Sequence, residues 1–315
     1  MTTKSKKADI PRYELGDFRH VHRAPGGGTD FGCNRLGRSK FIDGFELYSG
    51  EGLVGSVGPL RSAFYRMSIT VSGELDMQIG LEHFRHRPRT LAFTFPDQIF
   101  FKNNISADAS GYYILFKEGF LDELLPAARL PEEFPFLSIT GAPLFQVSEE
   151  ELTAVVALVA QMDQEVRGDR PGRIRALQLY LYLVLLEAKR SYLRQELNKP
   201  VPVAAGPALV GRFQKLVGTN VLTTRTVADY AALLAVSPNH LNKVVKEVTG
   251  KTASDSISEM LVQEAKSLLR YTDSSVAEIA YKLDFSDPAS FNRFFKGGTG
   301  ETPLAWRTRH LQANA

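Results

Sequence analysis

The sequence holds one cysteine, Cys33, among its 315 residues. A single cysteine cannot form an internal disulfide, and it excludes a zinc site built from several cysteines. Long hydrophobic runs are also missing, because the most apolar stretch, residues 176–186, falls well short of the roughly 20 residues that cross a bilayer. The lysines near the N-terminus are not followed by the apolar segment of a signal peptide. These absences predict a protein of the cytoplasm with no membrane partner.

Motifs of catalysis are missing as well. The sequence contains no Gly-x-Ser-x-Gly, no glycine-rich phosphate loop and no Cys/His pairing. A metal-dependent cupin enzyme needs a His-x-His, a following Glu and another His that converge on the metal. His20 and His22 have no Glu within the next few residues, and His83 and His86 are out of phase for one face of a strand. The sequence therefore predicts no catalytic residue, no metal and no cofactor.

Charge is nearly balanced over most of the chain. The net charge is +3, and residues 209–315 hold 13 basic and 10 acidic side chains, so the whole excess lies in the last third. With 43% hydrophobic and 23% charged residues the composition is that of a globular protein, which excludes disordered and collagen-like chains. Because the basic excess is small, pattern and spacing have to identify the partner.

The first half of the chain has the pattern of β-strands. Residues 1–44 are polar and glycine-rich, and we expect a loosely ordered arm with at most one strand there. Over residues 45–148 apolar side chains alternate with polar ones, as in Leu75, Met77 and Ile79. Short strands separated by turns predict a small antiparallel sandwich or barrel.

Residues 149–197 have helical periodicity instead. Ser148 and Glu151 match a capping box, which marks the start of the first of two helices. The second helix, 173–197, is apolar nearly all round its middle and must be covered by more than one neighbour. It belongs either to the core or to a dimer contact. Residues 198–208 are rich in proline and alanine and are predicted to form a linker.

The last domain, residues 209–315, contains an internal repeat. Val227-Ala228-Asp229 recurs as Val276-Ala277-Glu278 at an offset of 49, and Thr249-Gly250 recurs as Thr299-Gly300 at an offset of 50. Such a repeat fixes the architecture. Each copy reads as a first helix, a short turn, a second helix and a Thr-Gly stop. The expected helices cover about 226–235 and 238–248 in the first copy, and 275–283 and 288–297 in the second.

Each copy has the features of a helix-turn-helix unit. Ala231 and Ala280 are small enough for two helices to cross closely, and Pro238 and Pro288 stand where a helix start tolerates a missing N–H. The intervening segment, 253–270, is a predicted helix of roughly 27 Å, which with its flanking turns holds the two second helices about one DNA turn apart.

The second helix of each unit has an apolar and a polar face. The predicted inward residues are Leu241, Val244, Val245 and Val248, matched by Phe291, Phe294 and Phe295. The predicted DNA-contacting residues are Asn239, His240, Asn242, Lys243 and Lys246, matched by Ala289, Ser290, Asn292, Arg293 and Lys296. Arg and Lys bind guanine or phosphate and Asn reads adenine, so these side chains suit a major groove. Lys246 and Lys296 are expected at phosphates rather than at bases.

These residues carry a family resemblance. Ser275 to Ala280, Phe285 to Lys296 and Thr299 to Pro303 make the stretch from Leu209 to Arg307 resemble the paired helix-turn-helix domain of AraC/XylS-type transcriptional regulators. The resemblance implies that the second helix of each unit enters the major groove. The positions that match the family's base-contacting residues are Asn239, Asn242 and Lys243, then Ala289, Asn292 and Arg293.

The resemblance also implies the role of the first half. In this family a small cupin-like β-barrel and a pair of dimerising helices often precede the DNA-binding domain, in the same order as residues 45–148 and 149–197. Two positions depart from the family. Its turn glycine is Asp284 here, a residue that tolerates positive φ, and an arginine of the connecting helix is Met260. The pair Gly297-Gly298 is expected to weaken the end of the last recognition helix.

Aromatic residues gather in the predicted barrel. They either line a small-molecule pocket or form its core, since pockets are also mostly apolar. Arg66 suits an anionic effector. The candidate pocket residues are Phe64, Tyr65, Arg66, Phe93, Phe95 and Tyr113.

The sequence thus predicts an α+β chain in five parts: a polar N-terminal arm (1–44), a β-rich cupin-like sensor domain (45–148), a helical connector that dimerises (149–197), a linker (198–208) and an all-α domain with two helix-turn-helix units (209–315). The predicted function is that of a sequence-specific DNA-binding transcriptional regulator, with double-stranded DNA and a small-molecule effector as partners, acting as a homodimer. The alternative is a cupin-type enzyme with an appended helical domain.

Overall fold

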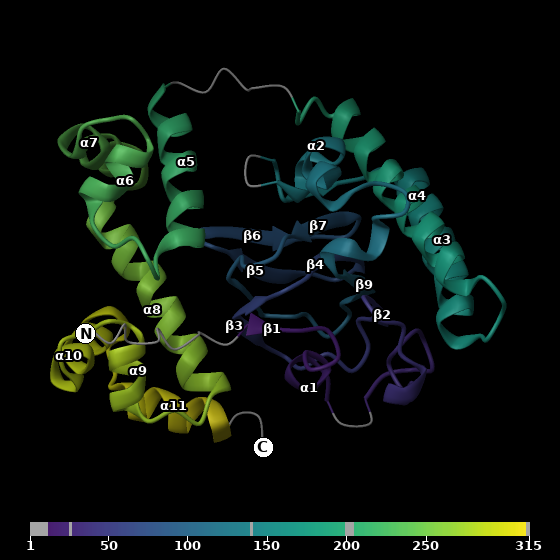
Figure 1. The fold of residues 1–315 in the computed structure, drawn as a ribbon, viewed down its shortest axis with the longest axis horizontal. Helices are drawn as coiled ribbons and strands as arrows, with labels where there is room; N and C mark the ends of the chain where they lie inside the picture. The colour runs from purple at the N-terminus through teal and green to yellow at the C-terminus, as the bar shows by residue number, and fades with distance from the viewer. Residues whose placement is uncertain (1–11, 25–26, 139–140, 199–204, 313–315) are drawn as a thin grey trace, which may run out of the picture.

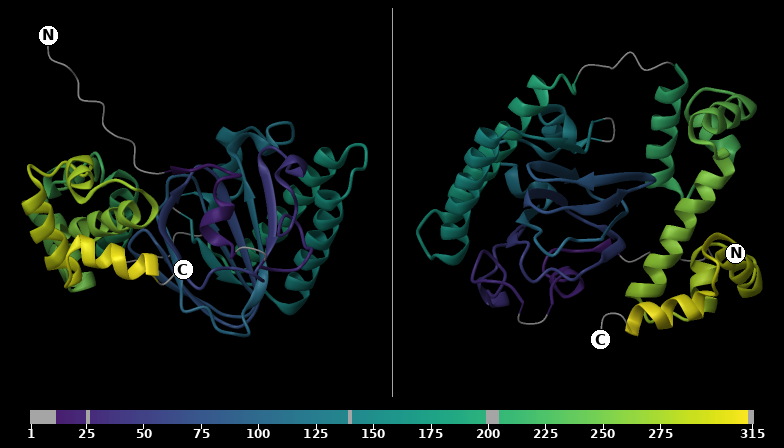
Figure 2. Two further views of the ribbon diagram at one scale, coloured as in Figure 1. Left: turned by 90° about the horizontal axis from the view of Figure 1, so that it is seen from below. Right: turned by 180° about the vertical axis from the view of Figure 1, so that it is seen from behind.

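A computed structural model describes residues 12–24, 27–138, 141–198 and 205–312. Two sheets lie in the middle of the molecule (Figure 1). The connector helices cover one side of the sheets, and the C-terminal helices lie on the opposite side, as the views from below and from behind also show (Figure 2). The first half is β-rich and the last third is all-α, as the sequence predicts.

Each sheet has five strands. The first has the order β1-β3-β8-β5-β6 and the second β10-β7-β4-β9-β2, with every pair antiparallel except β1 and β3. In chain order the strands are β1 (Arg12–Tyr13), β2 (Phe45–Ser49), β3 (Val57–Ser62), β4 (Tyr65–Ser72), β5 (Leu75–Ile79), β6 (Glu82–His86), β7 (Thr90–Thr94), β8 (Phe100–Asn103), β9 (Ser110–Phe116) and β10 (Leu144–Gln146). The sheets do not close into one barrel, so the domain is an open, cupin-like sandwich.

Both faces of the second sheet are buried. On β4 the side chains of Tyr65, Met67 and Ile69 alternate with polar ones. The apolar face lies toward the helical side, where Phe93, the partner of Met67, has its ring centre 4.2 Å from that of Phe136. The polar face looks across to the first sheet and is also buried. Its members on β4 are Arg66, Ser68 and Thr70.

The segment before β2 differs from the expected arm. Residues 12–44 include α1 (Arg19–His22) and a 3-10 turn η1 (Arg38–Lys40), and they pack on the sandwich. Phe18 and Cys33 are almost fully buried, and the Phe18 ring lies 5.4 Å from that of Phe64. Apolar residues are sparse here, but each one reaches the core, which periodicity does not reveal.

The connector consists of α3 (Glu149–Arg167) and α4 (Arg173–Arg194), preceded by α2 (Leu130–Glu133) and the 3-10 turns η2 (Glu118–Leu121), η3 (Ala127–Arg129) and η4 (Pro135–Leu137). The predicted capping box forms at the start of α3. One face of α4 is buried in the sandwich core, but its other face is not covered. Large apolar side chains exposed there are Leu179, Leu183 and Leu193, and Ile174 is exposed at the start of the helix.

The C-terminal part is built from seven helices: α5 (Ala205–Asn220), α6 (Val227–Leu233), α7 (Pro238–Thr249), α8 (Ala253–Tyr271), α9 (Val276–Lys282), α10 (Pro288–Thr299) and α11 (Pro303–Gln312). They enclose their own core around Phe213, Leu241, Phe291 and Trp306. Of the predicted linker, residues 199–204 lie outside the described residues, and α5 begins at Ala205. Within the described residues no helix is long and apolar enough to span a membrane.

Candidate nucleic-acid interface

The first helix-turn-helix unit is α6 and α7. Thr226 caps α6 by accepting the N–H of Asp229, and Ser237 caps α7 by accepting the N–H of His240. The turn between the helices holds Ala235 at φ 56°, in the left-handed region. Caps and turn together fix the direction in which α7 leaves the unit. Its buried side chains are Leu241, Val244 and Val245, whereas Val248, predicted to face inward, is 44% exposed.

The second unit, α9 and α10, repeats this construction. Ser275 and Glu278 form a capping box on α9, and Asp287 caps α10 by accepting the Ser290 N–H at 2.8 Å. Asp284 has φ 58° at the position equivalent to Ala235, so the residue that replaces the turn glycine does adopt positive φ. Phe291 and Phe295 are fully buried, and Phe294 is partly buried.

The glycine pair does not end α10, which continues to Thr299. A Cβ at Gly298 would lie 2.8 Å from the Val262 side chain, whereas a Cβ at Gly297 would meet nothing within 4 Å. Gly298 therefore allows α10 to approach α8 closely, and the expected weakening of the helix end is offset by that packing.

The two second helices, α7 and α10, lie on the side of α8 away from the sheets, α7 at the start of α8 and α10 beside its middle, where Gly298 approaches Val262 (Figure 1). Most of the predicted contact residues are exposed on them: Asn239, His240, Lys243, Lys246, Ala289, Arg293 and Lys296. The other three, Asn242, Ser290 and Asn292, are half-buried. The Nζ of Lys243 lies 3.9 Å from the carboxylate of Glu247, one helical turn along α7, and both side chains are exposed.

The two asparagines at equivalent positions make different bonds inside the protein. The Asn242 Oδ1 accepts the backbone N–H of Ala253 at 3.0 Å and so caps the start of α8. The equivalent of Ala253 in the second unit is Pro303, which has no N–H to donate. Asn292 instead donates its Nδ2 to the carbonyl of Pro288 at 2.9 Å. Asn242 therefore uses one acceptor site of its amide inside the protein, and Asn292 uses one of its two N–H donors.

The start of α10 carries a negative charge that α7 lacks. Hydrogen bonds from Ser290 lower the pKa of Asp287 to about 2, so its carboxylate is ionised at neutral pH. The Ser290 hydroxyl donates to this carboxylate at 2.7 Å and accepts from Arg293 at 3.0 Å. The equivalent cap of α7 is the neutral Ser237. The first unit is therefore the more favourable one for an anionic partner such as DNA.

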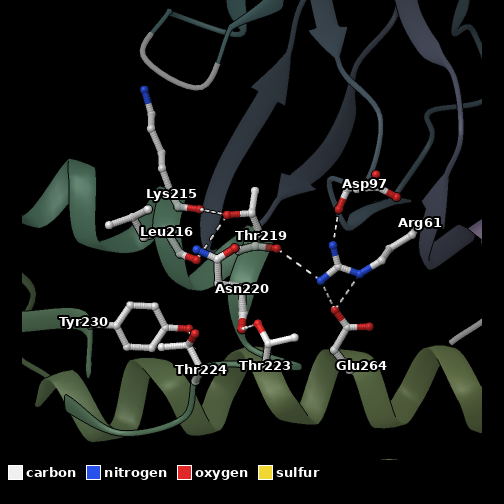
Figure 3. A network of polar contacts seen from close by, with 11 residues as sticks. Arg61, Asp97, Lys215, Leu216, Thr219, Asn220, Thr223, Thr224, Tyr230 and Glu264 are labelled. Atoms are coloured by element: carbon white, nitrogen blue, oxygen red, sulfur yellow. Dashed lines mark hydrogen bonds and ion pairs between the residues drawn. The ribbon is translucent and has the colours of Figure 1, made fainter. Parts of the chain in front are cut away.

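Helix α8, which connects the two helix-turn-helix units, contacts the sandwich. Arg61 on β3 donates from Nε to the Glu264 carboxylate at 2.8 Å, and its Nη2 also contacts that carboxylate (Figure 3). The same guanidinium reaches the carbonyl of Asp97 and, at 3.2 Å, that of Gly218 on α5. Glu264 is completely buried. Sequence patterns do not reveal this contact, because its partners lie 203 residues apart.

The six candidate pocket residues do not line one pocket. Tyr65 and Phe93 are on the helix-facing side of the second sheet, with the Tyr65 ring stacked 5.1 Å from that of Phe116. Phe95 lies at a small pocket beside α5. Arg66 and Tyr113 lie between the two sheets, where Arg66 is 3.6 Å from the ring centre of Phe100 and 5.7 Å from that of Phe64. The aromatic cluster is thus mostly core.

The histidines also have structural surroundings. His22 shares a hydrogen bond of 2.6 Å with the carbonyl of Phe18, and His86 shares one of 3.0 Å with Thr70. Burial lowers the pKa of His22 and takes that of His86 to about 3, so both rings are neutral. In the part of the chain that the structure describes, no cluster of His, Cys, Asp and Glu is arranged to hold a metal ion.

Comparison with known proteins identifies the repeat domain. Residues 230–309 match the family model of the helix-turn-helix domain. The chain is 38% identical over 103 residues to the HTH-type transcriptional regulator GlxA of Rhizobium meliloti (strain 1021), which covers 33% of this chain and 32% of GlxA. It is 28% identical over 180 residues to the HTH-type transcriptional activator RhaS of Escherichia coli O1:K1 / APEC, 53% of this chain and 62% of RhaS.

Two solved structures illustrate the extent of the likeness. ToxT from Vibrio cholerae is 13% identical with a TM-score of 0.41, covering 84% of this chain and 98% of ToxT. An AraC-type regulator from Chromobacterium violaceum is 23% identical with a TM-score of 0.33, covering 35% of this chain and 98% of its own. The matched part of this chain spans about a third of GlxA and under two thirds of RhaS. Residues 230–309 of this chain therefore carry a helix-turn-helix domain, similar to that of the transcriptional regulators GlxA and RhaS.

Proposed function

We propose that the protein is a sequence-specific DNA-binding transcriptional regulator whose two recognition helices, α7 and α10, enter successive major-groove segments. One observation supports this most: two helices of the same register expose matching polar faces on the same side of a single connecting helix, α8. At 1.5 Å per residue, the 19 residues of α8 span roughly 28 Å, which with the flanking turns approaches one DNA turn of about 34 Å.

Within this proposal the exposed residues have different roles. Lys243 and Arg293 read bases, with Asn239, His240, Ala289 and Ser290 beside them. Asn242 and Asn292 are half-buried and each is oriented by one internal hydrogen bond, so they reach a base only with the donors and acceptors that point out of the protein. Lys246 and Lys296, farther along the helices, bind phosphates.

Selection of binding sites from random duplex DNA tests the proposal. The full-length protein is used at physiological salt, because electrostatic binding masks specificity at low salt. Two half-elements about ten base pairs apart are expected. The variants Lys243→Ala and Arg293→Ala should each lose roughly 1–3 kcal/mol of binding free energy on the selected site and lose the sequence preference at one base pair. Lys296→Ala should weaken binding to all sequences by the same amount. Equal loss on every sequence from all three variants contradicts the base-reading roles.

We further propose that the protein works as a homodimer through α4. Leu179 and Leu183 are exposed one helical turn apart, and Leu193 extends the same uncovered apolar surface. Analytical ultracentrifugation of the full-length protein and of the double variant Leu179→Glu/Leu183→Glu tests this. The wild-type protein should sediment as a dimer and the double variant as a monomer. A wild-type monomer at micromolar concentration contradicts it.

A small-molecule effector in the sandwich and action in the cytoplasm complete the proposed function. The RhaS relative is described as an activator, and a ToxT structure as bound to unsaturated fatty acid. The competing enzyme function predicts bound metal and turnover. Metal analysis of the purified chain separates the two.

A further inference from the structure

The space between the two sheets is lined by unpaired polar side chains. Arg66 is 3% exposed, and neither of its terminal nitrogens has a hydrogen-bond partner in the described part of the chain. The Ser68 hydroxyl, two residues along the same face, and the hydroxyl of Thr94, the register partner of Arg66, are equally unpaired. A buried polar group without a partner costs free energy, so several in one place require an explanation.

A second buried cation stands opposite. Lys102 on β8 is 6% exposed, and within the described residues its ammonium makes no hydrogen bond or ion pair. Its Nζ lies 6.0 Å from the ring centre of Tyr113 on the other sheet. Burial and the nearby Arg66 charge lower the pKa of Lys102 to about 7, and burial lowers that of Arg66. Two like charges are therefore held together in a nonaqueous setting.

No carboxylate neutralises this pair among the described residues. Glu46 is on the same face of the second sheet, but its two oxygens accept the N–H of Gly16 and the hydroxyl of Tyr48. Arg23, a third buried cation nearby, is occupied by backbone carbonyls and by the Tyr113 hydroxyl at 3.0 Å. Arg66 is held in place by the rings of Phe18 and Phe100 rather than by an anion.

The chamber opens at one end of the sandwich. A pocket of about 40 Å³ is lined by polar groups that include Lys102, Ser68 and Tyr113, and Arg66 lies behind this lining, two residues along β4 from Ser68. A cavity needs roughly 10–15 Å³ to hold one water, so the pocket has room for a small polar head group. Leu53, Leu75 and Ile105 belong to the same lining and offer an apolar surface to the rest of a ligand.

We propose that this chamber binds a small organic carboxylate, with Lys102 as its direct charge partner, Ser68 as a hydrogen-bond donor and the Arg66 charge close behind them. A bound anion supplies the missing counter-charge for both cations and accepts from the unpaired donors that it reaches, which is the arrangement that makes a buried charge favourable. The apolar part of the lining selects ligands that carry an aromatic or aliphatic body. Binding of the carboxylate does not depend on the proposed regulatory function. Only an effect of the bound carboxylate on DNA binding rests on it.

Thermal unfolding of the full-length protein tests the site with probes of matched shape. Benzoate and octanoate at 10 mM should raise Tm by several degrees at constant ionic strength, whereas benzamide and octanamide should not. Lys102→Met and Arg66→Met should each lose the carboxylate-dependent rise. Lys40→Met, which removes an exposed lysine of the same domain, should keep it.

Three outcomes overturn the proposal: no Tm rise with either carboxylate, an equal rise with the amides, or a rise that survives in Lys102→Met. If Arg66→Met does not fold, Lys102→Met and Ser68→Ala test the site instead. Ser68→Ala should bind the carboxylates with several-fold weaker affinity in titration calorimetry. Loss of DNA binding with an intact carboxylate response refutes only the regulatory function, because the binding assay contains no DNA.

Discussion

The contact between Arg61 and Glu264 gives the sharpest test of how the two halves are held together. Substitution of Arg61 by Met leaves the Glu264 carboxylate, which is 0% exposed, without the guanidinium that donates to it. Removing one partner of a buried pair costs about 3–5 kcal/mol, because the remaining charge stays desolvated. We therefore expect Arg61→Met to destabilise the docked C-terminal part by that amount.

Urea unfolding followed by tryptophan fluorescence measures this loss. Trp306 is the only tryptophan in the sequence, and it is buried in the C-terminal core against Phe295. Extrapolation of the unfolding free energy to water gives the difference between variant and wild type.

Two further variants make the measurement specific. The double variant Arg61→Met/Glu264→Met should recover to within about 1 kcal/mol of wild type, because replacing both partners removes the unpaired charge. Arg85→Met breaks an exposed pair with Glu74, 58% and 41% exposed, and should lower the unfolding free energy far less than Arg61→Met does, because solvent screens an exposed pair. If Arg61→Met loses no more than Arg85→Met, or if the double variant loses the sum of the single variants, the buried pair does not hold α8 to β3.

Other predictions concern backbone and charge. Gly297→Ala should stabilise the folded protein by about 0.5–1 kcal/mol through helix propensity, and Gly298→Ala should not, because its Cβ meets Val262 at 2.8 Å. The urea midpoints of the two variants measure the difference, and equal gains would contradict the packing role of Gly298. Ala235→Gly should stabilise the folded protein by up to about 1 kcal/mol, since the φ of Ala235 is 56°. The control Ala232→Gly, at an exposed position within α6, should destabilise it by a similar amount. A loss of stability in both variants would argue against backbone strain at Ala235. The pKa of Lys102 is about 7 in the folded chain, against 10.5 when unfolded, so between these values the unfolded state binds more protons and the unfolding free energy should rise with pH. The charged and titratable groups facing Lys102 are Arg66, His22, His86 and Tyr113; the histidines titrate below this window, so Lys102→Met should flatten the slope measured from pH 7 to 9.

The helical domain could be predicted from the sequence because its signals are local. Caps such as Ser275 with Glu278, prolines at helix starts and the repeat itself all act within a few residues of the bond they form. The start of α6 differs from prediction by one residue, since the cap Thr226 stands outside the helix. The hydrogen bond that Asn242 accepts inside the protein could not be predicted, because its donor, the backbone N–H of Ala253, comes within reach only where α7 meets α8.

The sandwich was harder to predict for a physical reason. Alternation indicates that a strand has two different faces, and it leads to the expectation that the polar face meets solvent. In β4 both faces are buried, so Arg66 and Ser68 lie inside the domain. A charged residue within an apolar strand, as Lys102 directly after Phe100 and Phe101, is the one sequence signal of such a chamber. The exposed face of α4 is the opposite case, because an apolar helix surface does not say what covers it.

The proposed ligand chamber and the docking of α8 share one sheet. Lys102 on β8 pairs with Val57 on β3, and the same strand carries Arg61 to Glu264. Beside Val57, the backbone of Gly58 donates to the Tyr271 hydroxyl at 2.7 Å and its carbonyl accepts from Arg270 at the end of α8. An anion that binds Lys102 would therefore contact β8, the strand next to the one that holds α8. Binding changes DNA affinity only to the extent that the docked and undocked forms bind the anion with different affinity. Because the continuous helix α8 keeps the separation of α7 and α10, that difference would change DNA affinity without changing the spacing of the half-sites that the protein accepts.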